Sequence, residues 1–114
     1  MTASGKEEKM KNEKILALRC ALLIAVSEAD KAKDTNDGGT CNVDTPILFL
    51  PGWTWAQITE AFQLTGLVPS RRGSTVYILR ACDGQGFRRT AMAEAFRDSL
   101  KASGYNAAVD YQMD

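Results

Sequence analysis

The chain has 114 residues, which is enough for one domain. Hydrophobic residues make up 45% of it, and 14 Lys and Arg balance 14 Asp and Glu. This neutral charge excludes a general attraction to nucleic acid or to an anionic membrane, so such binding needs a local patch. The chain has no histidine, which excludes Ser-His-Asp and Cys-His catalysis and most zinc chemistry. Carboxylate or lysine chemistry would survive this exclusion, but no catalytic constellation is evident, so we expect no catalytic residue, no metal and no cofactor.

The cysteines Cys20, Cys41 and Cys82 are few and widely spaced. They form no CxxC pair, so they predict neither a disulfide framework nor a zinc site. The start of the chain is charged, and the longest apolar run, residues 20–26, is too short to cross a bilayer. We expect reduced thiols in a cytoplasmic protein that has no membrane partner.

The first predicted element is a helix over residues 11–33, after a polar stretch at residues 1–10. Ile15, Leu18, Leu22 and Val26 recur at helical spacing and give the helix a broad apolar face. This face must be buried, either on the chain's own sheet or in a homodimer with Leu18, Leu22 and Val26 at its centre. Residues 34–44 read as a loop, whose spacing does not fit a calcium-binding loop.

A short strand is predicted at residues 46–50, where proline takes the first position. Thr54 and Gln57 then form a capping box that opens a helix ending at Gly66. Trp55, among others, is expected on the apolar side of this helix. Residues 67–71 and 74–80 predict a hairpin with a turn at residues 72–73, and Pro69 assigns its first strand to the edge of the sheet.

The last predicted elements are a turn at residues 83–86, a helix over residues 88–103 and a strand over residues 106–112. We expect the buried stripe of this helix to contain Ala91, Met92, Ala95, Phe96 and Leu100. From residue 46 the order is β-α-β-β-α-β. This order predicts an α+β fold of the ferredoxin-like, split βαβ type, with an antiparallel sheet carrying two helices on one face.

The N-terminal helix is extra to this arrangement and could cover the open face of the sheet. If residues 67–71 are not a strand, the alternative is a three-stranded, partly parallel sheet. The expected organisation is a tail and helix at residues 1–35, a loop at 36–45 and an α+β domain at 46–114, all in one compact domain.

A local excess of positive charge is the first candidate site. Residues 66–90 contain five arginines and one acidic residue, and the guanidinium group suits the binding of phosphate or carboxylate. Two of the arginines would sit at the N-terminus of a helix, where a bound anion would relieve their conflict with the helix dipole. The alternative is a solvated surface with local ion pairs. The arginines are Arg71, Arg72, Arg80, Arg88 and Arg89.

Other features allow narrower hypotheses. Gly84 and Gly86 lie between a strand and a helix and could cradle a phosphate, but the pattern lacks a third glycine and a Walker lysine, so a simple turn is the alternative. Residues 58–77 have some character of a helix-turn-helix, although their connection is too long and a strand follows. Cys82 could be a reactive thiol near Arg88 or Arg89, although a small core residue is the favoured alternative. Trp53 is expected in the core or at its edge with the other aromatic residues, but because it follows a turn it could instead be an exposed interface anchor.

Two segments together carry a resemblance: GTCNVDTPILFLPGW at residues 39–53 and GQGFRRTAMAEAFRDSLKASGYNAAVDYQMD at residues 84–114. They resemble small, uncharacterised accessory proteins encoded by phages and conjugative elements of anaerobic gut bacteria. The two segments cover about two-fifths of the chain. The resemblance implies a setting rich in inhibitors of host defence, anti-CRISPR proteins among them, and assigns no residue a role.

Three hypotheses for the function follow. The first is a non-catalytic binding protein that docks on a host protein, such as a CRISPR nuclease complex, and inhibits it. The second is a nucleic-acid-binding module that uses the arginines, with Tyr77 and Tyr111 stacking on bases from the sheet. The third is an enzyme that acts on a phosphorylated ligand through Asp83, Arg88 and Arg89, although no general base is evident.

Overall fold

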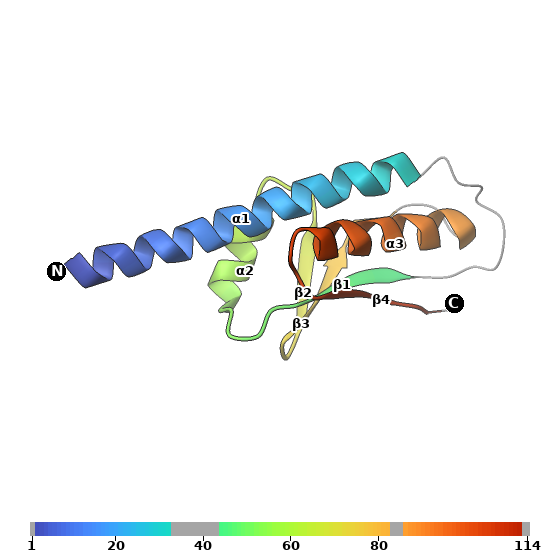
Figure 1. The fold of residues 1–114 in the computed structure, drawn as a ribbon. Helices are drawn as coiled ribbons and strands as arrows, with labels where there is room; N and C mark the ends of the chain where they lie inside the picture. The colour runs from blue at the N-terminus through green and yellow to red at the C-terminus, as the bar shows by residue number, and fades with distance from the viewer. Residues whose placement is uncertain (1, 33–43, 83–85, 113–114) are drawn as a thin grey trace.

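The computed structural model describes residues 2–32, 44–82 and 86–112, and in this part of the chain it confirms the α+β class with three helices and four strands (Figure 1). The strands form one antiparallel sheet in the order β2-β3-β1-β4. The elements in chain order are α1 Thr2–Ala32, β1 Thr45–Phe49, α2 Trp55–Phe62, β2 Val68–Arg72, β3 Thr75–Leu79, α3 Gly86–Ala102 and β4 Ala107–Asp110.

The register of the sheet fixes which side chains share a face. Ile47 of β1 lies opposite Tyr77 of β3 and opposite Ala108 of β4, so these three side chains point to the same side. Strand β2 is at the edge, as its proline predicts, because Pro69 cannot donate a ladder hydrogen bond on a central strand. The sheet therefore has four strands, and the three-stranded alternative is wrong.

All three helices lie on one side of the sheet (Figure 1). Helices α2 and α3 contact the strands, and α1 packs across α3 and α2 as a third, outermost layer. Leu48, Val76 and Ile78 face the helices and are almost fully buried. Alternate residues of β1 and β3 point the other way and are only partly buried. The expectation that the N-terminal helix covers the open face is therefore wrong, because its apolar face is already occupied by α3 and α2.

Helix α1 contributes its predicted apolar face to this core. Leu18 and Leu22 have no exposed surface, and Val26 is partly buried against the same cluster. A second copy of the chain cannot reach Leu18 or Leu22, so these residues are not the centre of a dimer interface. The guanidinium Nη2 of Arg19 donates a hydrogen bond to the backbone oxygen of Glu60 at 2.6 Å, which ties α1 to the C-terminal end of α2.

The ends of the helices show where local sequence signals acted. Helix α1 starts at Thr2 rather than near residue 11, because Lys- and Glu-rich residues extend a helix once it is nucleated. Helix α2 has the predicted capping box, in which Thr54 and Gln57 exchange side-chain and backbone hydrogen bonds. It ends at Phe62, earlier than predicted, and Leu64 follows in a left-handed conformation (φ +68°).

Helix α3 buries Met92, Phe96 and Leu100, as predicted. Ala93 is also fully buried, whereas the predicted Ala91 and Ala95 are only partly buried. The difference arises because α3 is the middle layer: α1 covers one side of it and the sheet covers another. The stripe predicted for a helix with one buried side is therefore incomplete.

Candidate functional site

The β2–β3 hairpin places two consecutive arginines on opposite faces of the sheet. Arg72 pairs with Thr75 across a two-residue turn whose first residue, Gly73, has φ +62°, as a type II′ turn requires. Because side chains alternate along a strand, Arg71 shares a face with the buried Val76, and Arg72 shares the open face with Tyr77. Each arginine has an aromatic residue on its own side of the sheet.

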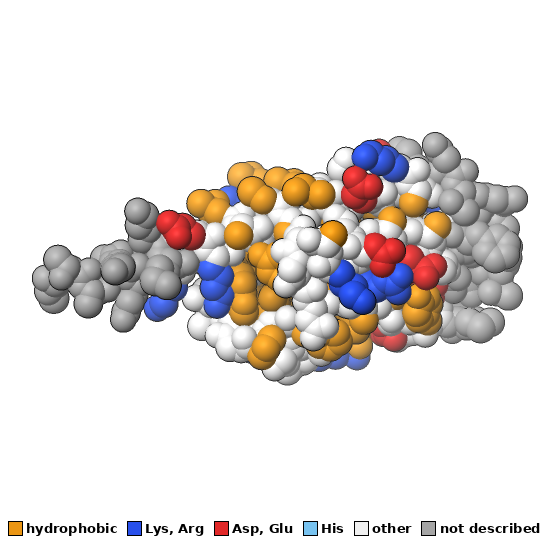
Figure 2. Space-filling model, in the orientation of Figure 1, with side chains coloured by type: hydrophobic (Ala, Val, Ile, Leu, Met, Phe, Trp, Pro, Cys, Tyr) orange, Lys and Arg blue, Asp and Glu red, His pale blue; other side chains and the backbone are white. Residues whose placement is uncertain are grey.

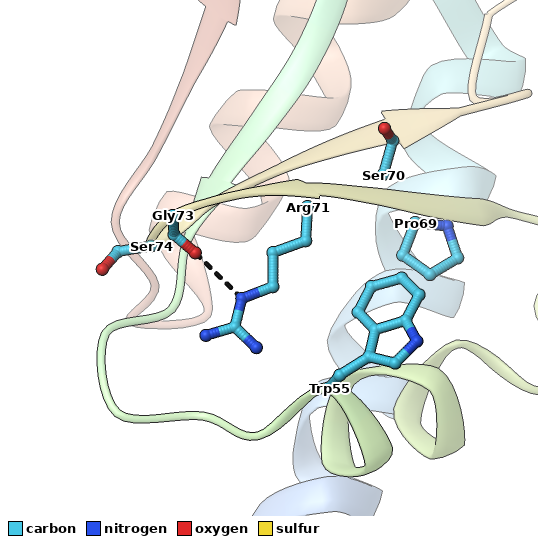
Figure 3. A pocket seen from close by; sticks show the side chains of 6 residues that line it. All are labelled: Trp55, Pro69, Ser70, Arg71, Gly73 and Ser74. Atoms are coloured by element: carbon cyan, nitrogen blue, oxygen red, sulfur yellow. Dashed lines mark hydrogen bonds between the residues drawn. The ribbon is translucent and has the colours of Figure 1, made fainter.

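On the helix side, Arg71 and Trp55 line one groove, with a volume of about 780 Å³ (Figure 3). The indole of Trp55 lies beside the ring of Pro69, and the Arg71 side chain extends down the same side of the hairpin. Arg71 Nε donates to the backbone oxygen of Gly73 at 2.9 Å, which fixes the direction of the side chain. Trp55 is 46% exposed although it is a large aromatic residue. This combination offers a flat apolar surface next to a cation.

On the open face, the Arg72 guanidinium carbon lies 5.0 Å from the centre of the Tyr77 ring. This is within the range of a cation–π interaction. At the far end of the same two strands, Val68 and Leu79 are opposite each other and are 37% and 40% exposed. In the described part of the chain no helix packs on this face. The open face thus carries aromatic and aliphatic side chains that water reaches.

We define the hairpin site as Trp55, Pro69, Arg71, Arg72 and Tyr77. Sequence reasoning named Arg71, Arg72 and Tyr77 but missed Trp55, which it assigned to a buried helix side. The position of Trp55 in the helix could have indicated its exposure. Trp55 is the first residue of α2, directly after the cap, where a side chain can point past the end of the core.

The remaining arginines do not join this site. Arg80 follows β3, so the length of that strand, about 16 Å, separates it from the hairpin turn. Arg88 and Arg89 belong to the first turn of α3, and Arg89 Nε donates to the backbone oxygen of Asp44 at 2.9 Å. The five arginines are therefore divided between the two ends of the sheet, and the single patch that the sequence suggests does not form.

Trp53 is only 9% exposed, so the prediction of a core position is confirmed and the alternative of an exposed interface anchor is wrong. The ammonium nitrogen of Lys14 lies 4.2 Å from the centre of its ring, so α1 covers the indole. Gly86 opens α3. Gly84 and Asp83, on which the phosphate-binding and enzyme hypotheses depend, lie outside the described residues, as do Cys41 and the loop compared with a calcium site.

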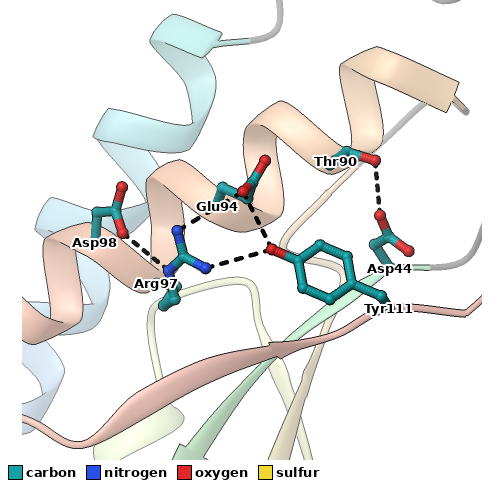
Figure 4. A network of polar contacts seen from close by, with 6 residues as sticks. All are labelled: Asp44, Thr90, Glu94, Arg97, Asp98 and Tyr111. Atoms are coloured by element: carbon teal, nitrogen blue, oxygen red, sulfur yellow. Dashed lines mark hydrogen bonds and ion pairs between the residues drawn. The ribbon is translucent and has the colours of Figure 1, made fainter.

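A network of polar contacts joins the start of β1, helix α3 and the end of β4 (Figure 4). Asp44 is buried, and its carboxylate accepts hydrogen bonds from Thr90 Oγ1 at 2.6 Å and from the Gln112 backbone N–H at 3.0 Å. The hydroxyl of Tyr111 donates to Glu94 at 3.1 Å and accepts from Arg97 at 3.3 Å. Burial and the bond to Glu94 raise the pKa of Tyr111.

Tyr111 therefore faces α3 and does not share the open face with Tyr77, so the two tyrosines cannot form one stacking platform. The helix-turn-helix hypothesis is also wrong, because β3 stands where a recognition helix would be. Of the other thiols, Cys20 is exposed and Cys82 is half-buried. Among residues 2–32, 44–82 and 86–112, no three acidic or cysteine side chains gather as a metal site would require, and no helix is both long and apolar enough to span a bilayer.

Comparisons with protein-family models, with curated proteins and with solved structures found no match to this chain. The hairpin site is therefore the feature that indicates what the chain can bind. That site holds two cations, an exposed indole and a phenol ring, which can bind a partner surface through apolar contact and through guanidinium hydrogen bonds.

Proposed function

We propose that the chain is a non-catalytic binding protein that docks on another protein through the hairpin site. The observation that carries this proposal is that Arg71 and Trp55 line one groove on the helix side, while Arg72 contacts the ring of Tyr77 on the open face. Trp, Tyr and Arg are the residues that dominate binding energy at protein interfaces. A tight turn holds both arginines in place, so a partner would meet an ordered surface and lose little entropy on binding.

The partner that we propose is a host defence protein in the cytoplasm, with a CRISPR nuclease complex as the leading candidate. The support is the resemblance to accessory proteins of phages and conjugative elements, together with a site suited to contact and not to a reaction. An inhibitor of this kind blocks a surface that the defence protein needs. The turn of the hairpin lies at one end of the sheet, where the backbone oxygen of Ser74 accepts a hydrogen bond from the Leu50 N–H at 2.8 Å, and its exposed arginines suit contact with such a surface.

For the fold, we infer a ferredoxin-like arrangement with modifications. The order of elements after α1 and the strand order β2-β3-β1-β4 in the antiparallel sheet support it. The short α2, which is eight residues long, and the added layer of α1 are departures from two helices of similar size. Residues 71–74 at the end of the hairpin are exposed, so neither helix covers them.

A nucleic-acid-binding module is the second candidate, and the Arg72–Tyr77 pair on an uncovered sheet favours it, because single strands stack on such surfaces. The division of the arginines weighs against it. Affinity for nucleic acid grows with the number of phosphate contacts along one surface, and the hairpin site offers two cations.

The experiment is a plasmid-interference assay in bacteria that carry an active CRISPR system. Expression of the chain should raise the survival of a targeted plasmid, and the double variant Trp55→Ala with Arg71→Ala should lose this protection. Both side chains are exposed, so the variant is expected to fold. Lys101→Ala, which removes an exposed cation from the end of α3, is the matched control and should protect like the parent chain.

Binding to a purified nuclease complex should agree with protection. The parent chain and Lys101→Ala should bind the complex equally well, and the double variant should bind it more weakly. Titration of a fluorescent single-stranded oligonucleotide at two salt concentrations separates the second candidate. Tight, salt-dependent binding of the oligonucleotide, lost on Arg72→Ala, would replace the protein-docking proposal. Equal protection by the double variant and the parent would show that the hairpin site is not the docking surface.

A further inference from the structure

Helix α1 has a second apolar stripe on the side away from the core. Leu16, Leu23 and Ile24 are 52%, 43% and 53% exposed, and Cys20 between them is also exposed. The spacing of these residues, i, i+4, i+7 and i+8, places them on one line of the helix. We call Leu16, Cys20, Leu23 and Ile24 the outer stripe. Figure 2 shows hydrophobic side chains gathered along the free edge of α1.

The residues of the outer stripe lie outside the buried core cluster, and Ile24 at its edge lines a hollow shared with α3. Helix α1 is the outermost layer, with α2 and α3 packed on its opposite side (Figure 1). A surface helix normally carries polar residues on such a side, and neighbouring exposed aliphatic residues mark a contact surface. Because the helix here is straight and open along its length, a second helix can lie along it.

The charges at the two ends of the stripe select the occupant. Glu13 and Lys31 are exposed. Glu13 lies three residues before Leu16, and Lys31 lies seven residues after Ile24, so both extend the line of the stripe. A second copy in antiparallel orientation, related by a twofold axis near residue 22, brings Glu13 of each copy opposite Lys31 of the other. A parallel copy would bring like charges together. The stripe is therefore complementary to itself in one direction.

Lys31 already forms an exposed ion pair with Glu28 at 3.0 Å. This pair does not prevent the contact with a second copy, because an ammonium group has three donors and an exposed pair of this kind is weak.

We propose that the chain forms an antiparallel, twofold-symmetric homodimer through the outer stripe of α1. Such an interface is isologous, so every contact occurs twice. The hairpin site lies at the β2–β3 turn and the start of α2, away from the outer stripe, so this association does not depend on the docking function proposed above. The same axis places the two Cys20 residues about 6 Å apart along the helices.

The first test is analytical ultracentrifugation of the full chain over a concentration series from micromolar to one millimolar. We expect a reversible monomer–dimer equilibrium. The double variant Leu23→Glu with Ile24→Glu should raise the dimer dissociation constant by at least about 30-fold, the effect of losing an interface hot spot. Leu64→Glu is the matched control, because Leu64 is 87% exposed and lies outside the stripe, and it should dimerise like the parent.

The second test concerns orientation. Glu13→Lys should weaken the dimer about fivefold, since two ion pairs become repulsive contacts, and Glu13→Lys combined with Lys31→Glu should restore it. A short bismaleimide should crosslink the dimer through Cys20, and Cys20→Ser should abolish the crosslink. A monomer at every concentration would overturn the proposal. So would a dimer that keeps its affinity in the double glutamate variant, or a charge reversal that the second exchange does not rescue.

Discussion

The hydroxyl of Thr90 donates a 2.6 Å hydrogen bond to the buried carboxylate of Asp44 and so joins the first turns of α3 to the start of β1. The other carboxylate oxygen accepts the Gln112 backbone N–H, which adds the end of β4 to the same point. One side chain thus connects three segments that are far apart in the sequence.

Replacement of Asp44 by alanine should destabilise the fold. Both donors would lose their carboxyl acceptor in a buried setting, and we expect the free energy of unfolding to fall by about 3 kcal/mol. Urea denaturation followed by circular dichroism measures this change. Asp98→Ala is the control, because Asp98 is exposed and forms its ion pair with the neighbouring Arg97, and it should change stability by less than about 0.5 kcal/mol. Equal effects of the two variants would contradict the assignment.

The alkaline limit of stability should depend on Tyr105 and Tyr111. Burial raises the pKa of Tyr105, and burial and the Glu94 bond raise that of Tyr111, above the ordinary value of 10.0. The folded chain therefore keeps both phenol protons to higher pH than the unfolded chain does. Their contribution is fully present below pH 10 and is lost as the pH rises through the folded pKa values.

Absorbance at the phenolate wavelength should show two tyrosines that titrate late in the folded chain and normally in denaturant. The variant with both tyrosines changed to phenylalanine should lose less stability between pH 9 and 11 than the parent does. An equally steep alkaline loss in both proteins would assign the effect to other groups.

Replacement of Gly73 by alanine tests the geometry of the hairpin turn. No atom lies within 4 Å of the place where its Cβ would be, so the effect comes from the backbone conformation at φ +62° alone. We expect a loss of about 1 kcal/mol in unfolding free energy and weaker docking, because the turn directs Arg71 and Arg72. Ser74→Ala, in the same turn, should leave both properties near those of the parent.

Leu64 offers a gain in stability. It holds a left-handed conformation (φ +68°) with 87% of its surface exposed, and asparagine adopts this conformation more easily than leucine. Leu64→Asn should raise the free energy of unfolding by about 0.5–1 kcal/mol. Leu16→Asn, a similar exchange at an exposed helical position, should lower it instead. A decrease for both variants would show that the left-handed strain at Leu64 is small.

The elements that the sequence predicts well are those with a local chemical signal. Thr54 and Gln57 form a capping box that needs no tertiary contact, and Pro69 restricts its strand to an edge wherever the sheet lies. Periodicity also identified Leu18 and Leu22 as buried. It could not say what buries them, because an apolar face is equally suited to a sheet, to helices or to a second copy.

The candidate site was harder to predict because proximity in sequence is not proximity in space. Arg72 and Arg80 are eight residues apart, yet an extended strand separates them further than a helix would. Arg71 and Arg72 are adjacent, yet the pleat turns them to different faces. The two tryptophans show a similar effect. Trp53 is buried and Trp55 is exposed, although they are only two residues apart beside the start of α2.

The order of the layers determines how long the apolar sides of α1 stay uncovered during synthesis of the chain. Helix α1 is made first, but the middle layer that covers its inner side ends with Leu100 of α3, nearly eighty residues after Leu22. At usual rates of translation this interval is about 4–16 s. During it, both apolar sides of the first helix are exposed to chaperones and to neighbouring nascent chains. Lower growth temperatures and co-expression of chaperones should therefore raise the yield of soluble protein. Substitutions on the surface of the sheet should raise it less.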